Sequence, residues 1–366
     1  MADLTNDFVA QIRDAAAAKC PLNIEGSGSK RWYGNQVVAQ RQLVTTGHTG
    51  IVEYDPAELV LTARAGMTLA DIEATLAERG QMLPFEPPRY APESTLGGVI
   101  ATALSGPGRP FVGGVRDFVL GMHVIDGKGD VLKFGGQVMK NVAGYDVSRL
   151  MTGSLGILGL ISQVSIKVLP VPVATATLRF ELSEAEAIRR VNEWSGKPLP
   201  LTASAWEGGV LHVRLSGARA AVDSAIHQMR GVLLDVPGAK IFWDSLRDQT
   251  HPFFCDTHEM NTNQTLWRLS LPAIAPSIAA DRLQGATHQL IEWGGGQRWL
   301  WSDARGDAVR AVAHELGGHA VRFNNQHGGG ETFAQPSAAL MAIHRRLKQT
   351  FDPQGIFNPG RLYQGL

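Results

Sequence analysis

Glycine residues gather in three separated clusters within about the first 160 residues of the chain, and no other feature of the sequence constrains the fold as strongly. The clusters lie at residues 26–30, 94–108 and 153–161. Glycine has no Cβ, so its backbone reaches left-handed conformations and approaches a neighbour or a ligand closely. Helix packing explains one such cluster. Three clusters favour a single long ligand held between several loops.

The first cluster is Gly26-Ser27-Gly28-Ser29-Lys30, and it follows a short apolar segment at 20–24 that is typical of a strand. Successive backbone N–H groups in such a loop form a cradle for an anion, and the serine hydroxyls add donors. A diphosphate fits this cradle. An ordinary glycine–serine turn explains the segment about equally well.

Two common nucleotide-binding loops do not match this segment. The P-loop pattern GxxxxGK[ST] is missing. The dinucleotide pattern GxGxxG also fails, because residue 31 is Arg31 rather than glycine, and residues 31–34 separate the loop from any helix. The sequence therefore favours neither ATP nor a nicotinamide cofactor.

The second and third clusters extend the same argument. Small residues at 97, 98, 101 and 103 indicate close backbone approach in the second cluster, and the third leads directly into a strand at 161. A cofactor long enough to reach three separate loops is FAD.

These motifs, in their order and spacing, resemble the FAD-binding domain of the vanillyl-alcohol oxidase or p-cresol methylhydroxylase (PCMH-type) family. The resemblance covers residues 20–170 and the C-terminus. It rests on the Gly/Ser loop at 26–30, T-x-G-G-x-x-A-T at 95–102, R-D-x-V-L-G at 116–121, G-Y-D at 144–146, G-S-x-G-x-L-G-x-I at 153–161 and F-D-P-x-x-x-x-N-P-G at 351–360.

The resemblance implies an α+β fold, in which a PCMH-type domain of two α+β subdomains binds FAD beside a mixed α/β substrate or cap domain. It implies contacts to FAD from Gly26, Ser27, Gly28, Ser29, Lys30, Pro88, Thr95, Leu96, Gly97, Gly98, Ala101, Thr102, Arg116, Asp117, Gly153, Ser154, Gly156, Gly159 and Ile161. No histidine stands where this family attaches its flavin covalently, so we expect noncovalent FAD.

Within this family, the segments at 84–88, 140–146 and 150–156 are similar to those of the smaller flavin-binding subunits of bacterial three-subunit glycolate oxidases. That resemblance implies oxidation of a small 2-hydroxy acid, glycolate, to glyoxylate. It also implies a hetero-oligomer with a larger FAD-binding subunit and an iron–sulfur subunit, through which electrons reach a membrane quinone. The sequence assigns no catalytic base.

Two departures from the family keep other functions open. Ala103 stands where the family often has asparagine, and the G-D-G-N-L-H-type segment of the larger subunit is missing. The second departure favours a non-catalytic electron relay or scaffold whose companion subunit oxidises glycolate. A stand-alone FAD oxidoreductase acting on another alcohol or a sugar nucleotide is a further alternative.

Periodicity and turn residues predict the organisation of the chain. We expect the FAD-binding domain at 1–172, with subdomains at about 1–60 and 61–172, a substrate or cap domain at 173–330, and a tail at 331–366 that returns to the FAD domain. Predicted helices lie at 68–80, 184–194, 218–229 and 337–351, and predicted strands at 59–63, 119–124, 131–134, 161–169, 178–182, 211–215, 268–271, 299–301 and 320–323.

Composition excludes several classes of protein. The chain carries 34 basic and 34 acidic residues, so nothing electrostatic favours nucleic acid. Only Cys20 and Cys255 occur, which predicts a reducing cytoplasm and leaves too few thiolates for an iron–sulfur centre. No apolar run reaches the roughly 20 residues of a membrane-spanning helix. We therefore expect a cytoplasmic protein, and the resemblance implies that it contacts the inner membrane only through partner subunits.

Several other polar groups are weaker candidates for a site. A metal site at His251, Cys255 and His258, or at His314 and His319, has irregular spacing, so we expect no metal. Single arginines are candidates to hold a substrate carboxylate, but a surface or structural role is favoured for each of them. These are Arg268, Arg298 and Arg322. Tryptophans that suit either a core or a subunit interface are Trp206, Trp243, Trp267, Trp293, Trp299 and Trp301.

Overall fold

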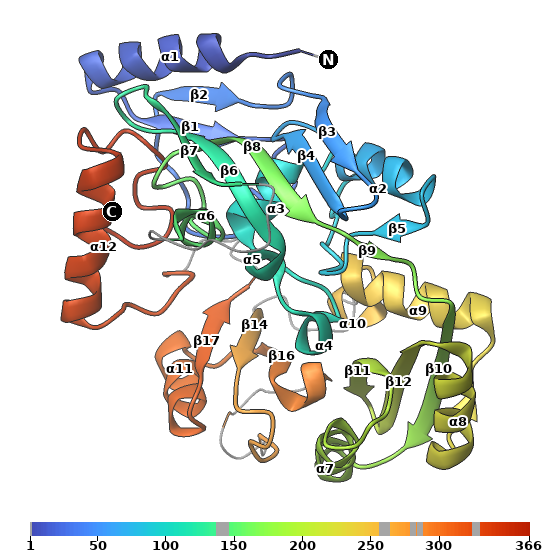
Figure 1. Cartoon of the computed structure of the whole chain (residues 1–366). Coiled ribbons are helices and arrows are strands. Elements are labelled where there is room, and N and C mark those ends of the chain that lie inside the picture. Colours follow the sequence, from blue (N-terminus) through green and yellow to red (C-terminus); the bar gives the residue numbers. More distant parts are fainter. Residues whose placement is uncertain (1, 137–145, 256–263, 279–282, 284–287, 324–329) are drawn as a thin grey trace. The chain divides into compact units, whose positions relative to one another are not determined.

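The computed structural model describes residues 2–136, 146–255, 264–278, 283, 288–323 and 330–366. Within these ranges the chain divides into two compact units (Figure 1). The first unit comprises residues 1–104, 114–170 and 335–366, and the second comprises 105–113 and 171–334. Both units mix helices with sheets, so the predicted α+β class is confirmed.

The first unit contains three sheets and the N- and C-terminal helices. Its strands are β1 (Leu22–Glu25), β2 (Arg41–Val44), β3 (Ile51–Asp55), β4 (Val60–Arg64), β5 (Gln81–Met82), β6 (Val119–Ile125), β7 (Val131–Gly135), β8 (Leu160–Lys167) and β9 (Leu169–Pro170). Its helices are α1 (Thr5–Ala18), α2 (Leu69–Ala77), α3 (Leu96–Thr102), α5 (Val115–Phe118), α6 (Val147–Met151) and α12 (Ala338–Phe351).

Pairing in the first unit follows the sequence signals closely. A five-stranded antiparallel sheet has the order β3-β4-β8-β6-β7, and β1 pairs with β2 in parallel. The strands predicted at 119–124 and 131–134 are confirmed as β6 and β7, which pair as an antiparallel hairpin. The predicted helix α2 is confirmed with its cap, because the Thr68 side chain accepts a hydrogen bond from the backbone N–H of Asp71.

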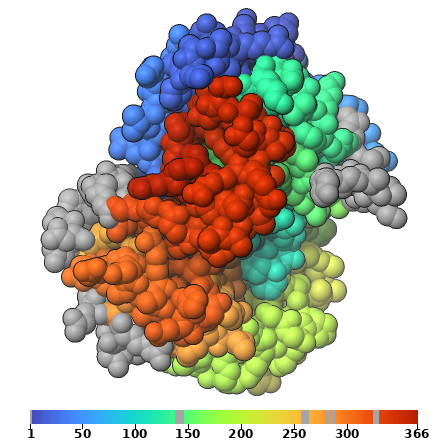
Figure 2. Space-filling model, turned by 90° about the vertical axis from the view of Figure 1, so that its left-hand side faces the viewer, coloured from blue at the N-terminus to red at the C-terminus, as the bar shows by residue number. Residues whose placement is uncertain are grey.

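The C-terminal segment belongs to the core of the first unit. Phe8 and Ile12 of α1 bury their side chains together with Leu22 of β1 and Phe357 of the tail. The backbone of Leu22 donates to Ile356 O at 2.7 Å and accepts from the N–H of Asn358 at 3.0 Å. In Figure 2 the C-terminal residues, in red, lie against the blue N-terminal residues of the same unit. The end of the chain therefore helps to build the sheet region that carries the first glycine cluster.

The second unit is an eight-stranded antiparallel sheet with helices on both faces. The strand order is β13-β10-β12-β11-β15-β16-β14-β17. The strands are β10 (Ala174–Glu181), β11 (Leu201–Glu207), β12 (Val210–Gly217), β13 (Val232–Leu233), β14 (Thr265–Ser270), β15 (His288–Glu292), β16 (Gln297–Ser302) and β17 (His319–Arg322). The helices are α4 (Arg109–Val112), α7 (Glu184–Ser195), α8 (Arg219–Met229), α9 (Val236–Asp248), α10 (Pro252–Cys255), the 3-10 turn η1 (Trp293–Gly295) and α11 (Gly306–Glu315).

Alternation along β10 decides which helices cover which face of this sheet. Leu178 joins the apolar cluster formed with α7 and α8. The neighbouring residue Thr177 points to the opposite face, where its hydroxyl accepts a hydrogen bond from Trp243 Nε1 of α9 at 2.9 Å. Figure 1 accordingly shows α9 across the sheet from α7 and α8.

Candidate functional site

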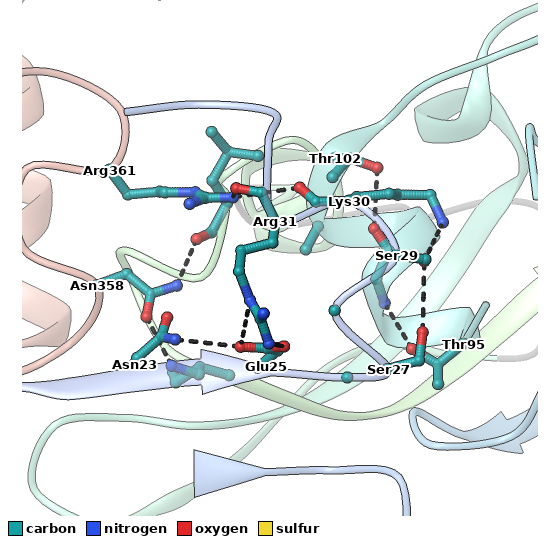
Figure 3. Close-up of a pocket in the computed structure, with 16 residues that line it drawn as sticks. Asn23, Glu25, Ser27, Ser29, Lys30, Arg31, Thr95, Thr102, Asn358 and Arg361 are labelled. Atoms are coloured by element: carbon teal, nitrogen blue, oxygen red, sulfur yellow. Dashed lines mark hydrogen bonds and ion pairs between the residues drawn. The ribbon is translucent and has the colours of Figure 1, made fainter. Parts of the chain in front are cut away.

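A pocket in the first unit brings the first glycine cluster together with residues that are distant in sequence (Figure 3). Predicted site residues that line it are Gly26, Ser27, Gly28, Ser29, Lys30, Thr95, Gly98, Ala101 and Thr102. Lining residues that the sequence analysis did not select are Asn23, Ile24, Glu25, Arg31, Leu155, Asn358 and Arg361.

The loop at 26–30 needs its glycines for close packing and for backbone conformation. A Cβ on Gly26 would overlap Thr95 Oγ1, the N-cap of α3. Gly28 has φ of +78°, which side-chain-bearing residues rarely adopt. Gly26 therefore leaves little room for a side chain, Gly28 holds a backbone conformation that disfavours one, and the loop lies directly against the start of α3.

Lys30 places a positive charge at the inner end of this loop. Its side chain is buried, with 7% of the residue exposed, and Nζ donates to Ser94 Oγ at 2.8 Å and to Ser29 Oγ at 3.4 Å. Ser94 Oγ lies 2.8 Å from Ser29 Oγ, so the same hydroxyl fixes the loop and the ammonium group. The buried ammonium places a positive charge against the Gly/Ser loop, which suits an anionic ligand.

The second glycine cluster forms the helix α3 rather than the loop that its glycine content suggests. Thr95 caps the helix by accepting from the N–H of Gly98. Gly97 faces away from the pocket, because a Cβ there would lie 2.9 Å from the Cβ and 3.1 Å from the carbonyl oxygen of Ala65. The structure thus gives Gly97 a close helix–strand contact, whereas Gly98 lines the pocket.

This difference predicts opposite effects for two neighbouring substitutions in one helix. We expect Gly97→Ala to lower the free energy of unfolding by about 1–3 kcal/mol, because the added methyl overpacks against Ala65. Gly98→Ala is the matched control, since its Cβ meets only Thr95 Oγ1 at 3.3 Å and a helical alanine gains about 0.5–1 kcal/mol over glycine. Urea unfolding measures both; equal effects would contradict this assignment.

The third cluster packs against the end of α3. Its backbone donates from Gly153 N–H to Ile100 O and from Leu155 N–H to Ala101 O, both at 2.9 Å. Gly153, Leu155 and Gly156 all have positive φ, of 86°, 53° and 74°. This run of left-handed residues explains the G-S-x-G spacing. The hydroxyl of Ser154 is buried and has no hydrogen-bond partner within the described residues, so it remains able to bind a further group.

The tail motif connects the loops around this pocket. Asn358 is 4% exposed; its Oδ1 accepts from the N–H of Ile24 at 2.7 Å and its Nδ2 donates to Leu155 O at 2.8 Å. Arg361 donates to the carbonyl oxygens of Lys30 and Arg31 at 3.2 and 2.8 Å. Burial lowers the pKa of Arg361 to about 10, so this arginine stays charged at neutral pH. The tail thus adds a second cation beside the loop.

Glu25 and Arg31 form an ion pair across the same pocket, visible at the centre of Figure 3. Glu25 also accepts from Asn23 Nδ2 at 3.2 Å and Gln42 Nε2 at 2.8 Å. The Glu25 carboxylate raises the pKa of Arg31, first through a hydrogen bond and then through charge. Glu25 therefore competes for a guanidinium that an anionic ligand would otherwise contact.

The other predicted site residues lie outside this pocket's lining. Pro88 is buried and Arg116 is exposed, while the Asp117 carboxylate accepts from the N–H of Gly114 at 2.8 Å. A Cβ on Gly159 would lie 2.6 Å from Val124 Cγ1, which is a packing contact. Outside the lining as well are Leu96, Gly97, Gly153, Ser154, Gly156 and Ile161. Residues 140–145 and His258 lie outside the described residues.

The weaker candidates have structural contacts. Arg298 is fully buried and donates to the carbonyls of Ala275, Pro276 and Gly295. Burial lowers the pKa of Arg298 and that of Arg322, which stacks on the Trp267 ring. Trp206, Trp243 and Trp301 donate to partners inside the second unit, and Trp267 is fully buried.

Among the described residues, no group of three or more His, Cys, Asp or Glu side chains could hold a metal ion. Among the helices in those same ranges, none is long and apolar enough to cross a bilayer.

Comparisons with known proteins agree with this geometry. Residues 2–135 match the family of the FAD binding domain, and residues 304–362 match the C-terminal domain of FAD linked oxidases. The glycolate oxidase subunit GlcE of Escherichia coli K12 is 47% identical over 364 residues, covering 100% of this chain and 99% of that protein. The glycolate oxidase subunit GlcD of Bacillus subtilis is 34% identical over 161 residues, covering 44% of this chain and 34% of that protein.

A solved structure supports the fold alone. An alkyldihydroxyacetonephosphate synthase matches with a TM-score of 0.67 at 14% identity, covering 97% of this chain and 75% of the synthase. The synthase is too distant in sequence to say more. The full-length relative and the two family matches decide the assignment: the chain belongs to the family of glycolate oxidase GlcE subunits, within the FAD-linked oxidases.

Proposed function

We propose that this chain is the FAD-binding subunit of an enzyme that oxidises glycolate to glyoxylate and passes the electrons to an iron–sulfur subunit and then to a quinone. The family membership supports the reaction, since the full-length relative is a glycolate oxidase subunit. The single structural observation that carries the proposal is the buried Lys30 inside a Gly/Ser loop. A cation in such a loop suits the diphosphate of a dinucleotide.

The residues of the pocket fit FAD on chemical grounds. Lys30 and Arg361 supply positive charge, and Gly26 and Gly28 in the loop at 26–30 carry no side chains of their own that could shield the neighbouring backbone N–H groups. The buried, unpartnered hydroxyl of Ser154 offers a further donor near the third cluster. In this proposal FAD is noncovalent, and its remaining contacts come from the other residues that the family motifs assign, including Arg116 and Asp117.

The cofactor and the protein have separate roles in this proposal. The bound cofactor supplies a hydride acceptor. The chain's own residues hold the diphosphate, orient the cofactor and exclude water from it. The same proposal includes domain boundaries at 172 and 331 and a second domain that binds the small 2-hydroxy acid. It also includes a cytoplasmic location and contact with the inner membrane only through partners. Finally, it includes assembly with a larger FAD-binding subunit, and the subunit names of the relatives support this assembly.

One assay separates this proposal from its alternatives. The purified chain should be yellow, release FAD on acid precipitation, and reduce an artificial electron acceptor when glycolate is added. A yellow chain that is inert alone, but active with the larger subunit, would assign it the role of relay. A chain that turns over another alcohol and ignores glycolate would be a stand-alone oxidoreductase. A colourless chain that FAD cannot reconstitute would contradict the proposal altogether.

The Glu25–Arg31 pair predicts a gain of affinity from a loss of charge. We expect Glu25→Gln to tighten FAD binding about 5-fold. The Glu25 carboxylate repels the anionic diphosphate, and two like charges about 4 Å apart in water repel by about 1 kcal/mol. That energy corresponds to about a 5-fold change in the dissociation constant. The substitution removes a negative charge from the pocket and releases Arg31 for the diphosphate. Fluorescence titration of the FAD-free chain measures the dissociation constant. The exposed Glu78→Gln is the control, and unchanged or weaker binding in Glu25→Gln would contradict the competition.

A further inference from the structure

A second cavity, of about 290 Å³, lies entirely within the second unit between its sheet and α9. Its polar walls are Arg179, Glu207, His212 and His251, and its apolar walls include Val210 and Phe242. Nothing in the proposed flavin site involves these residues. The volume lies near the lower limit of about 300 Å³ for small-molecule sites.

Strand register places the polar groups side by side on one face of the sheet. Arg179 of β10 pairs with His212 of β12, and His212 pairs with Ala205 of β11. The neighbours Leu178 and Val213 point into the apolar cluster on the other face. The polar side chains therefore line the cavity because alternation along both strands aims them at α9.

His212 offers an unused hydrogen-bonding ring to this cavity. Its ring stacks on Phe242 with centroids 4.1 Å apart, and it makes no hydrogen bond to any residue in the described part of the chain. Burial, followed by the nearby Arg179 charge, lowers the pKa of His212 to about 4. The ring is neutral at pH 7, so it carries one N–H that can donate.

One oxygen of the carboxylate in the cavity wall already has a hydrogen-bonding partner. Glu207 Oε1 lies 2.9 Å from His288 Nε2, whereas Glu207 Oε2 lies 3.6 Å from His251 Nδ1. His251 Nδ1 accepts from the N–H of Phe253 at 3.4 Å, so this nitrogen does not donate to Glu207. Because burial lowers the pKa of His251, its ring tends to be neutral and to carry its proton on Nε2. His251 therefore offers a further N–H donor on Nε2 and no free acceptor.

Arg179 has donor capacity beyond its ion pair with Glu181. Its guanidinium lies 3.2 Å from Glu181, whose side chain is 78% exposed. An exposed pair of this kind contributes only about 0–1 kcal/mol, and a guanidinium has five N–H donors. Among the described residues that line this cavity, donors therefore outnumber free acceptors.

We propose that this cavity binds a small monocarboxylic acid, with its carboxylate on Arg179 and His212 and its carbon chain against Phe242 and Val210. One guanidinium matches one carboxylate in a bidentate pair, and the Glu207 carboxylate in the same wall would repel a phosphate dianion more strongly than a monocarboxylate. The apolar walls favour an acid with a short hydrocarbon chain. This inference is independent of the proposed flavin chemistry.

The test is binding of sodium hexanoate to the full-length, FAD-loaded chain. Calorimetry should give saturable binding, and NMR of labelled histidines should show a raised pKa for His212, since a neighbouring carboxylate favours the charged ring. Arg179→Gln should weaken binding at least 10-fold. Arg219→Gln, an exposed arginine of α8, is the matched control and should leave binding unchanged. Hexan-1-ol, which lacks the carboxylate, should bind at least 10-fold more weakly.

Three outcomes would overturn the proposal. One is the lack of saturable hexanoate binding. Another is binding that survives Arg179→Gln and leaves the His212 resonance unmoved, which would place hexanoate elsewhere. The third is glycolate binding as tightly as hexanoate with the same dependence on Arg179, which would remove the role of the apolar walls. None of these readouts requires turnover, so they are separate from the test of the flavin site.

Discussion

Replacing Asp352 by asparagine should destabilise the first unit by about 3–5 kcal/mol, because it breaks a buried ion pair. Asp352 is 1% exposed, and its Oδ2 accepts from Lys348 Nζ at 2.7 Å and from the N–H of Phe357 at 2.8 Å. Lys348 Nζ also donates to Ile157 O and Phe357 O, both at 2.7 Å. The substitution leaves this ammonium buried without its carboxylate.

Urea unfolding measures the loss, and hydrogen exchange locates it. Amide exchange at residues 22–25 should accelerate, because Ile24 N–H is bonded to the tail through Asn358. The matched control is Asp130→Asn, a surface acid whose side chain is 58% exposed beside Arg13; it should change stability by less than about 0.5 kcal/mol.

A double-mutant cycle gives the sharper form of this prediction. Lys348→Met combined with Asp352→Asn removes both charges. The double variant should therefore lose less free energy of unfolding than the two single variants lose together, by about 0.5–3 kcal/mol. Simple additivity would mean that the two groups do not act as a pair. An Asp352→Asn chain as stable as the parent would show that the tail motif is not anchored by this carboxylate.

Short-range signals explain why so much of the fold could be predicted. The capped helix α2 and the β6–β7 hairpin each depend on turn and cap residues within a few positions, and both were confirmed. The helix α1 was missed, although Phe8, Ile12 and Ala15 follow a helical period, because its alanine-rich face carries few large apolar residues. The second glycine cluster was misread as a loop because a Thr95 cap and packing against Ala65 outweigh the low helix propensity of glycine.

The candidate site shows the limit of a single sequence in a different way. The Gly/Ser loop was identified directly, because its chemistry is local. Arg361 was not, since its contact with Lys30 O joins residues 331 positions apart. The motif around Asn358 was noticed as a family resemblance, yet nothing in the sequence says that its side chain bridges Ile24 and Leu155. Distant residues become site residues only through the tertiary fold.

The largest effect on cofactor binding should come from Lys30→Met. A hydrogen bond to a charged group contributes about 1.5–3 kcal/mol, so we expect the dissociation constant for FAD to rise about 10- to 150-fold. The exposed Lys128→Met at the β6–β7 turn is the control and should bind FAD normally. Fluorescence titration of the FAD-free chains measures all of these constants.

Two further variants separate the charge of Lys30 from its structural role. Ser94→Ala removes the hydroxyl that holds both Ser29 and the Lys30 ammonium, but it keeps the cation. If charge dominates, Ser94→Ala should weaken FAD binding much less than Lys30→Met does. Lys30→Arg keeps the charge on a wider group and should fall between the two. Equal losses in Ser94→Ala and Lys30→Met, with equal losses of stability in urea, would mean that Lys30 shapes the loop without contacting the diphosphate.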